Sequence, residues 1–515
     1  MATPNQELFP VILIHGISGS RLISKQTVYP ILPPLTPRVE EEYPIWLNLL
    51  MSTVPARPIP NDDVEINSNP EKVTLKTLGW NLPDSTISSR TVPTITPAPW
   101  WKTQMTLGVD GITASNDEDN HPVEGFKAIE RVAPDTEPDF DPETGKDNRY
   151  FAALIEKLVR QGYVKNENNN QGNLVAFPYD WRVSPKGLNE KYGYFNKLKD
   201  EIQKQREYNK KRVVIIAHSM GNRVTQYFLQ WVKSKGELGE QWIDENIERY
   251  IAVSPPWLGG PLAIRFLGSD DPIVLGKAAI KDLKSVIQSY SSVPWLLPIT
   301  KAPEAFLNTE HFAFVKEKSK DASRINDFQP KIIRDILTDG GAEQTTLKYQ
   351  QEHYQDDNLI RSIVDGDGGK LVECPPVQKL DVIYAYGTPT HVGAYYLSSV
   401  EEIDGKQTKS LRVAADLNDT DGNFLVKDGI RFEIEGKTEQ LIDGSTHSGD
   451  GIVPYGSLAY HKHWQNNKSL KTEIGDYGFH LSDAATYPGH EEILKVNQGT
   501  NKILELLGLS TFKLV

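Results

Sequence analysis

The sequence predicts an α/β fold with a mainly parallel central sheet flanked by helices. Short apolar strands alternate with amphipathic helices over much of the 515 residues, a pattern typical of parallel sheets. Hydrophobic residues make up 38% of the chain and charged residues 24%, which is ordinary for a globular protein with a buried core. We expect one elaborated domain over residues 1–515, because α/β domains with insertions often reach this length.

The expected elements follow the chain in order. PVILIHG at 10–16 predicts the first strand, and residues 148–162 predict a helix that stops at Gly162, with Asp147 or Asn148 as its cap. The apolar face of this helix is expected to hold Tyr150, Leu154, Ile155, Leu158 and Val159. The later elements are a strand in NLVAFPYDWR, a charged helix near 188–208, the strand RVVIIA, a helix after Ser219, and strands at 249–254 and 380–387.

Three stretches interrupt this alternation and are expected to be insertions. Residues 31–120 are rich in Pro, Thr, Asn and Asp and predict an irregular excursion. Residues 261–330 contain a helical pattern followed by the Pro-bounded apolar stretch SVPWLLPIT, which suits a cap or lid. Residues 388–445 alternate polar and apolar positions between Gly/Asp turns, and they predict antiparallel hairpins.

Charge and cysteine content restrict the possible partners and location. The formal net charge is −13 and no Lys/Arg block stands out, so nucleic acid is not an expected partner. Cys374 is the only cysteine, so no intramolecular disulfide can form, which fits a reducing compartment. The sequence shows no signal-peptide pattern and no apolar run of the ~18 residues that a membrane span needs. We therefore expect a cytoplasmic protein whose membrane contact, if any, is peripheral.

One stretch resembles a calcium-binding loop. DLNDTDGNFLVK begins at Asp416, but its sixth position is Asp421 where a glycine is needed, and its twelfth is Lys427 where a glutamate is needed. A hairpin turn is the preferred interpretation. The sequence thus predicts neither a metal nor a cofactor.

The stretch VVIIAHSMGN at 213–222 predicts a nucleophile. A strand, a sharp turn with small residues and a helix would present the hydroxyl of Ser219 clear of the backbone, near a helix N-terminus that favours developing negative charge. The departure from the usual pattern is Ala217 in place of the first glycine. The alternative is a strand-to-helix connection in which Ser219 only caps the helix.

A serine nucleophile needs a histidine and a carboxylate, which follow it in the order Ser, Asp, His in α/β hydrolases. Asp450 in HSGDGIVPY and His490 in YPGHEEIL fit this order, and both are expected on loops. Asp365 and Asp367 are the competing carboxylates, although they precede the strand at 380–387 and suit a solvated turn. The competing histidines are His218, which is expected to pack beneath the turn, and His447, His461, His463 and His480.

Acyl transfer also needs backbone donors aimed at the oxyanion of the tetrahedral intermediate. Met220 follows the nucleophile and is the first expected donor. Ile17, after Gly16 in the loop HGISGS, is the second, unless this segment is a plain turn.

Taken together, these motifs resemble the lecithin:cholesterol acyltransferase-like α/β hydrolases, a group related to phospholipid:diacylglycerol acyltransferases and lysosomal phospholipase A2. YDWR and PWLGG are more specific than the serine motif, which lipases share. The resemblance spans most of the chain in order, through PVILIHGISGSRL, IWLNL, FPYDWR, AHSMGN, SPPWLGG, VPWLLP, YGTPT, GDGIVP and GHEEIL.

The resemblance implies a role for each matching residue. It implies Ser219 as nucleophile, Asp450 as the acid that orients the imidazole, and His490 as general base and acid. It further implies Ile17 and Met220 as oxyanion donors, site support by Gly16, Asp180, Trp181 and Arg182, an acyl-pocket position for Trp257, membrane contact near Trp46 and a lid at 261–300. This chain departs from the family pattern in three ways. Extracellular members carry disulfides that hold the lipid-binding region, which a single cysteine cannot provide; family members often have Pro at the position of His15; and the hairpin insertion after YGTPT is larger here than is usual.

The expected reaction is acyl transfer through an acyl-Ser219 intermediate. Attack by water would give lipase or phospholipase activity and attack by a lipid alcohol would give acyltransferase activity; the sequence does not decide between them. The alternatives are a soluble carboxylesterase or lactonase for small esters, and a non-catalytic binding protein that kept the fold. Trp46, Leu50 and Trp295 would contact lipid if they are exposed, whereas the opposite reading packs them against the core as part of the cap.

Overall fold

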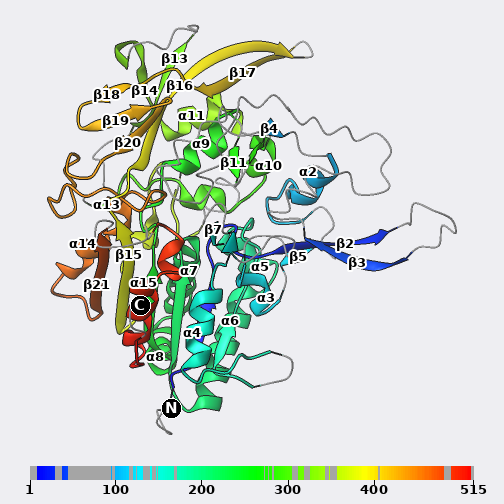
Figure 1. Ribbon diagram of the computed structural model, residues 1–515, viewed down its shortest axis with the longest axis vertical. Coiled ribbons are helices and arrows are strands. Elements are labelled where there is room, and N and C mark those ends of the chain that lie inside the picture. Colours follow the sequence, from blue (N-terminus) through cyan, green and yellow to red (C-terminus); the bar gives the residue numbers. More distant parts are fainter. Residues whose placement is uncertain are drawn as a thin grey trace.

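The computed structural model is built around a six-stranded, entirely parallel sheet (Figure 1). Its spatial order is β21 (Glu473–His480), β15 (Lys379–Tyr386), β10 (Ile247–Val253), β9 (Val213–His218), β1 (Val11–Ile14) and β8 (Leu174–Ala176). The structure describes residues 8–28, 38–44, 94–95, 99–114, 120–122, 124–131, 140–141, 146–147, 149–167, 171–271, 273–275, 278–280, 283–303, 311–317, 325–342, 347, 357–362, 364–403, 406–480 and 489–511.

Alternate residues of the strands bury their side chains on opposite faces of this sheet, as the two-residue period of a strand requires. Ile12 and Ile14 join the core cluster that contains α6 (Tyr194–Asn209) and α7 (Met220–Lys233). Val11 and Leu13 join the cluster with α3 (Phe126–Ile129), α4 (Ala152–Arg160) and α15 (Asn497–Leu506). Helices therefore cover both faces, and the predicted α/β class with a mainly parallel sheet is confirmed.

Two expected helices have different bounds in the structure. The helix expected from residue 148 begins at Ala152 as α4, so Tyr150 lies before it rather than on its apolar face. Its N-cap is Phe151, without a side-chain hydrogen bond to the helix. The charged helix near 188–208 is two helices, α5 (Pro185–Glu190) and α6, because Gly193 between them has a φ of 61°.

A second, seven-stranded sheet lies beyond the carboxyl ends of the central strands (Figure 1). The range 388–445 contributes β16 (Thr390–Ile403), β17 (Lys406–Val413), β18 (Asp419–Asp421), β19 (Phe424–Lys427) and β20 (Ile430–Glu433), all joined by antiparallel pairs. The calcium-loop-like stretch forms the β18–β19 hairpin. The sheet also takes in β13 (His311–Glu317), which pairs with β16 in parallel, and β14 (Gln329–Ile332). Two separate expected insertions thus meet in one sheet.

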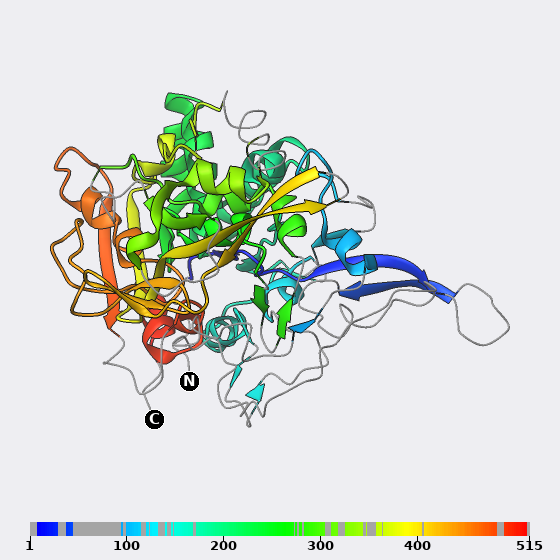
Figure 2. The same cartoon turned by 90° about the horizontal axis from the view of Figure 1, so that it is seen from above.

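Strands near the N-terminus form a ribbon that projects from the body in both views (Figures 1 and 2). This ribbon consists of β2 (Leu22–Val28), β3 (Arg38–Pro44) and β5 (Asn120–Pro122). Most of the predicted excursion at 31–120 lies outside the described residues. Within the described part of the chain, helices are too short or too polar to cross a membrane.

The remaining elements connect these parts. They are β4 (Thr94–Ile95), α2 (Pro99–Met105), β6 (Phe140–Asp141), β7 (Lys146–Asp147), α8 (Glu237–Asn246), α9 (Leu262–Gly268), β11 (Ile273–Leu275), β12 (Ala278–Ile280), α10 (Lys284–Gln288), η2 (Val293–Leu296), η3 (Ile325–Asp327), α11 (Ile333–Asp339), η6 (Gly369–Val372), α13 (Tyr455–Leu458), α14 (His461–Gln465) and η8 (Glu492–Leu494).

Candidate active site

Ser219 lies at the turn between β9 and α7 in a strained backbone conformation. Its φ is 52° and its ψ is −127°, a region that non-glycine residues rarely occupy and that is often found at functional sites. Although Ser219 is the N-cap of α7, its side chain makes no hydrogen bond to the helix. The hydroxyl lies instead 2.7 Å from Nε2 of His490. The simple capping interpretation of Ser219 therefore does not describe this structure.

Two glycines allow the chain to pack closely around this turn. A Cβ on Gly221 would lie 2.3 Å from the carbonyl oxygen of His15, and a Cβ on Gly16 would lie 2.7 Å from Cβ of Ser219. Neither backbone position has room for a side chain. The turn after β9 and the loop after β1 are thereby pressed against each other.

His490 lies between Ser219 and Asp450 and contacts both. Its Nδ1 is 2.7 Å from Oδ2 of Asp450, on the side of the ring opposite to Ser219. The amides of Ile452 and Val453 donate to Oδ1 of Asp450 at 3.0 and 2.8 Å and fix the carboxylate. Burial lowers the pKa of the His490 imidazole, but the Asp450 carboxylate raises it, and the pKa lies above its ordinary value overall.

These three side chains meet at the carboxyl edge of the central sheet. Ser219 follows β9, Asp450 forms a bridge with Thr388 just after β15, and His490 comes ten residues after the end of β21 at His480. In open parallel sheets, ligands bind outside this edge. The side chains are nearly covered, with exposed fractions of 10% for His490 and 0% for Asp450.

His218 lies beneath the turn and supports the neighbouring histidine through its backbone. Its Nε2 is 2.8 Å from the carbonyl oxygen of His490, and its Nδ1 is 2.6 Å from the hydroxyl of Tyr150. A carbonyl only accepts, so Nε2 carries the proton and Nδ1 accepts from Tyr150. Burial lowers the pKa of His218 well below its ordinary value, which keeps the ring neutral. His218 is thus not in position to accept the proton of Ser219.

The loop after β1 carries the expected oxyanion donor Ile17. Gly16 donates its N–H to the Tyr150 hydroxyl at 3.0 Å, so the Gly16 amide is already engaged. Ile17 is partly buried against the main core. Met220 is the first residue of α7, where an amide N–H has no acceptor within its helix. Both expected donors therefore border Ser219, one in the following position and one in the loop that touches it.

The expected support residues form buried contacts behind this loop. Arg182 donates from Nη2 and Nε to the carboxylate of Asp180 at 2.7 and 3.0 Å, and its side chain is fully buried. The indole of Trp181 donates to the carbonyl of Ser20 at 3.2 Å. Trp257 is also fully buried and packs edge-on against Trp464, with ring centroids 5.1 Å apart.

The competing side chains have other partners. Asp365 accepts from Arg334 and Ser362, which fits a surface turn. Asp367 accepts from the amide of Gly369. Among the histidines, His461 is 3.0 Å from Asp476, His463 stacks on Tyr460, and His447 and His480 contact Glu435.

The expected lipid contacts divide into two cases. Trp46 and Leu50 lie outside the described residues. Trp295, in η2, is only 1% exposed and packs edge-on against Tyr227. The structure therefore favours the alternative in which Trp295 packs against the core, and it does not support the lipid contact expected for this residue, because a buried indole cannot also face a lipid surface.

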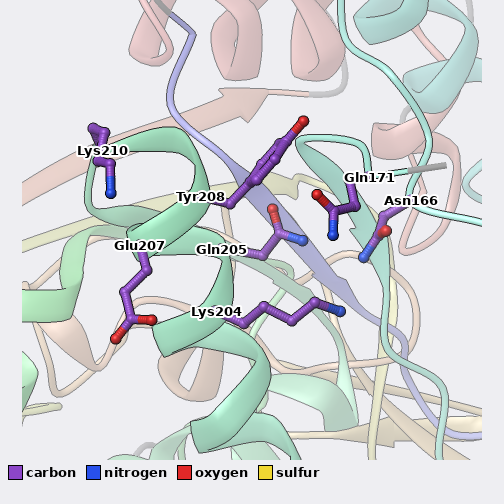
Figure 3. A pocket seen from close by; sticks show the side chains of 7 residues that line it. All are labelled: Asn166, Gln171, Lys204, Gln205, Glu207, Tyr208 and Lys210. Carbon is purple, nitrogen blue, oxygen red and sulfur yellow. The ribbon is translucent and has the colours of Figure 1, made fainter. Parts of the chain in front are cut away.

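A surface groove beside α6 lies apart from this site (Figure 3). It is lined by Asn166, Gln171, Lys204, Gln205, Glu207, Tyr208 and Lys210. Its lining includes none of Ser219, Asp450 and His490, so it is not where an acyl group would meet the nucleophile.

Sequence reasoning missed a buried glutamate that holds the loop of Asp450. Oε1 of Glu433, at the end of β20, accepts from the amides of Gly449 and Tyr455 at 2.7 and 2.8 Å. Burial raises the pKa of Glu433 to about 7, although these amides lower it. Its only signal in the sequence is a glutamate within the alternating stretch RFEIEG, which looks like an ordinary strand position.

Comparison with known proteins agrees with the expected family. A family model described as lecithin:cholesterol acyltransferase matches residues 100–477. A phospholipid–sterol O-acyltransferase of Arabidopsis thaliana is 27% identical over 353 residues, which cover 57% of this chain and 52% of that protein. The human lysosomal phospholipase A and acyltransferase is 30% identical over 266 residues, covering 50% and 53%.

One further sequence relative matches a short part of the chain, and one solved structure aligns with nearly all of it. A phospholipid:diacylglycerol acyltransferase of Schizosaccharomyces pombe is 37% identical over 123 residues, 24% of this chain and 18% of that protein. A solved structure, the Tle4–Tli4 complex, aligns over 98% of this chain and 99% of that chain with a TM-score of 0.42 and 12% identity. The chain spans about half the length of the first two acyltransferase relatives. Because the family model matches well over half of its residues, this chain belongs to the lecithin:cholesterol acyltransferase family.

Proposed function

We propose that this protein is a serine-dependent lipid acyltransferase or phospholipase that works through an acyl-Ser219 intermediate. The observation that carries the proposal is the position of His490, whose two ring nitrogens lie 2.7 Å from Ser219 Oγ and 2.7 Å from Asp450 Oδ2. This is the geometry of a nucleophile, a base and an orienting acid. Membership of an acyltransferase family supports a lipid ester as the substrate.

In the first half of the proposed reaction, His490 acts as base and then as acid. Asp450 accepts the Nδ1–H bond, which leaves the lone pair of Nε2 directed at the Ser219 hydroxyl. Nε2 takes the hydroxyl proton while Oγ forms a bond to the acyl carbonyl carbon. When the tetrahedral intermediate collapses, the bond to the leaving alcohol breaks and His490 returns the proton to the alcohol oxygen. The raised pKa of His490 fits a group that holds this proton transiently.

In the second half, an acceptor takes the acyl group from Ser219. Its O–H proton passes to His490 as its oxygen attacks the acyl carbonyl, and the proton then returns to Ser219. Water as acceptor releases a free fatty acid, and a lipid alcohol yields a new ester. The amides of Ile17 and Met220 would stabilise the oxyanion in both halves, since both border Ser219.

We propose that the segment 261–330 acts as a lid over this site. The small exposed fractions of Ser219, at 7%, and of the His490 side chain, at 10%, support this proposal, because a covered nucleophile needs an opening through which a long acyl chain can enter. The residues around Trp46 are proposed to contact the membrane. Vesicle sedimentation of a Trp46→Asp, Leu50→Asp variant tests this role, and unchanged binding would remove it.

The reaction is tested with vesicles of an acyl-labelled phospholipid and an excess of a long-chain alcohol. The wild type should release labelled product, and Ser219→Ala should lose activity by about 10⁴-fold or more. New ester identifies an acyltransferase, and free fatty acid alone identifies a phospholipase. Faster turnover of short soluble esters than of vesicles would favour a soluble esterase. Absence of labelled product would contradict the proposal.

Ser292→Ala is the matched control for loss of a hydroxyl. Ser292 is buried, and its Oγ has no hydrogen-bond partner among the described residues. This variant should keep wild-type activity within a few-fold. Equal loss in both variants would mean that general destabilisation, rather than loss of the nucleophile, explains the Ser219→Ala result.

A further inference from the structure

Two histidines and a glutamate converge beside the loop of Asp450. Nδ1 of His447 lies 2.7 Å and Nε2 of His480 lies 3.3 Å from the same oxygen, Oε1 of Glu435. The candidate ligand atoms of these three residues all lie within 4.8 Å of one another. The sequence presents His447 and His480 only as competing bases, because nothing in the spacing of 435, 447 and 480 shows that they meet.

We propose that Glu435, His447 and His480 bind one zinc ion. Two imidazole nitrogens and a carboxylate oxygen are a donor set that zinc uses with one position left open, and nitrogen ligands disfavour calcium and magnesium. Tetrahedral ligands at about 2.0–2.1 Å from zinc lie about 3.3 Å apart. The separation of 3.3 Å between His480 and Glu435 already fits, and the 2.7 Å pair needs to open only slightly.

The surroundings orient the carboxylate and leave space for a fourth ligand. Oε2 of Glu435 accepts from the backbone N–H of Ser448 at 2.7 Å and faces its hydroxyl at 3.3 Å, so this second oxygen is held while Oε1 stays directed at the histidines. Such outer contacts orient metal ligands. The exposed fractions of the side chains are 29% for Glu435, 33% for His447 and 25% for His480, so water has access to the fourth position.

The three ligands come from three parts of the fold. Glu435 follows β20 of the second sheet, His447 lies three residues before Asp450, and His480 ends β21 of the central sheet. The ring of Tyr386, at the end of β15, packs beside both histidines, with its centroid 4.5 Å from that of His447 and 5.1 Å from that of His480. Zinc would therefore join the second sheet and the loop of Asp450 to the edge strand of the central sheet.

The test uses the full chain without an affinity tag, freed of metal with a chelator. Isothermal titration with Zn²⁺ should show one ion per chain, and Zn²⁺ should raise the thermal midpoint, because an ion that binds only the folded state stabilises it. Mg²⁺ and Ca²⁺ should do neither. The His447→Ala and His480→Ala variants should weaken zinc binding by more than the ~10- to 100-fold that loss of an outer contact causes.

His463→Ala is the matched control, because His463 stacks on Tyr460 outside the cluster and its variant should bind zinc like the wild type. Glu435→Gln keeps the side-chain shape if the alanine variants fail to fold, and Glu439→Gln, at an exposed position nearby, is its control. Zinc binding that is absent, or that survives unchanged in the cluster variants, would overturn the proposal. Metal content and thermal midpoint do not depend on acyl transfer, so the zinc proposal and the proposed function fail separately.

Discussion

The loops that carry Ser219 and Asp450 are held in place in different ways. Ser219 lies between strand β9 of the central sheet and helix α7. Its strained turn packs against the glycine-rich loop after β1. Asp450 sits in a long loop that groups from elsewhere hold. Glu433 accepts from the amide of Gly449, and the Thr390 hydroxyl accepts from the amide of Gly451 at 2.9 Å.

The difference shows that a functional side chain can be held in position either by steric restriction of its loop or by a buried network of hydrogen bonds. The turn of Ser219 is restricted because Ser219 has a positive φ and because neither Gly16 nor Gly221, which pack around it, has space for a Cβ. At Asp450, buried hydrogen bonds hold the loop in place. Removing one partner of such a bond leaves a buried polar group unsatisfied, which destabilises the folded state. Changes in the two loops should therefore have different signatures.

The largest effect within this comparison is expected for Asp450→Asn. This change should lower kcat by about 10⁴-fold, because the amide no longer holds the imidazole in the tautomer that accepts the Ser219 proton. Activity of the wild type should rise with pH as His490 loses its proton. Since Asp450 raises the pKa of His490, that rise should move to lower pH in the variant. A pH–rate profile checks this, and an unshifted profile would contradict the proposed contact.

The next effect is expected for Gly221→Ala in the other loop. The new Cβ would meet the His15 carbonyl oxygen at 2.3 Å, so the turn must shift and both oxyanion amides with it. Activity should fall by about 10²- to 10³-fold. Gly260→Ala is the control, because its Cβ would meet its nearest atoms at 3.8 Å. Kinetics of both variants measure the effect, and equal activities would show that the turn tolerates expansion.

The same difference explains what the sequence could predict. The turn of Ser219 is made by consecutive residues, so the strand, the small residues and the helix of VVIIAHSMGN reveal it directly. The order of Ser219, Asp450 and His490, their loop positions and the parallel sheet also follow from local patterns. Local patterns succeed here because the carboxyl ends of parallel strands meet at one edge.

Contacts across long sequence separations could not be predicted in this way. Tyr150 looks like a core position of a helix, yet it lies before α4 and links Gly16 to His218. Glu433 looks like a strand residue, yet it holds the loop of Asp450. The parallel pairing of β13 with β16 joins the expected cap segment at 261–330 to the expected hairpin segment at 388–445, and no local sequence pattern predicts this contact.

Glu433→Gln tests the polar network through its pH dependence. Burial raises the pKa of Glu433 to about 7, so the folded state binds its proton more tightly than the unfolded state. Its contribution to stability is full below its unfolded pKa of about 4.3 and is lost as pH rises through about 7. The neutral glutamine lacks this dependence.

The free energy of unfolding of the wild type, relative to Glu433→Gln, should therefore fall by about 3 kcal/mol between pH 4.5 and pH 8. Urea titrations at both pH values provide the measurement. The exposed Glu439→Gln variant should follow the wild type at both. A constant difference between wild type and Glu433→Gln would mean that Glu433 stays charged throughout.

The smallest effect is expected for Tyr150→Phe, which removes contacts of the loop after β1 and leaves the loop of Asp450 unchanged. Without the hydroxyl, the Gly16 N–H loses its acceptor and Nδ1 of His218 loses its donor, while Asp450 keeps all its contacts. The free energy of unfolding should fall by about 1–3 kcal/mol. Activity should fall only about tenfold, because Ser219 and His490 remain in contact.

The matched control for Tyr150→Phe is Tyr163→Phe. Both residues are buried in the same core cluster, but the Tyr163 hydroxyl has no hydrogen-bond partner among the described residues. Its removal should leave stability unchanged or slightly higher, because a buried polar group without a partner is lost. If both variants lost the same stability and activity, packing of the ring rather than the hydroxyl would position the loop after β1. A loss confined to Tyr150→Phe would show that the hydroxyl couples the oxyanion loop to the backbone of His490.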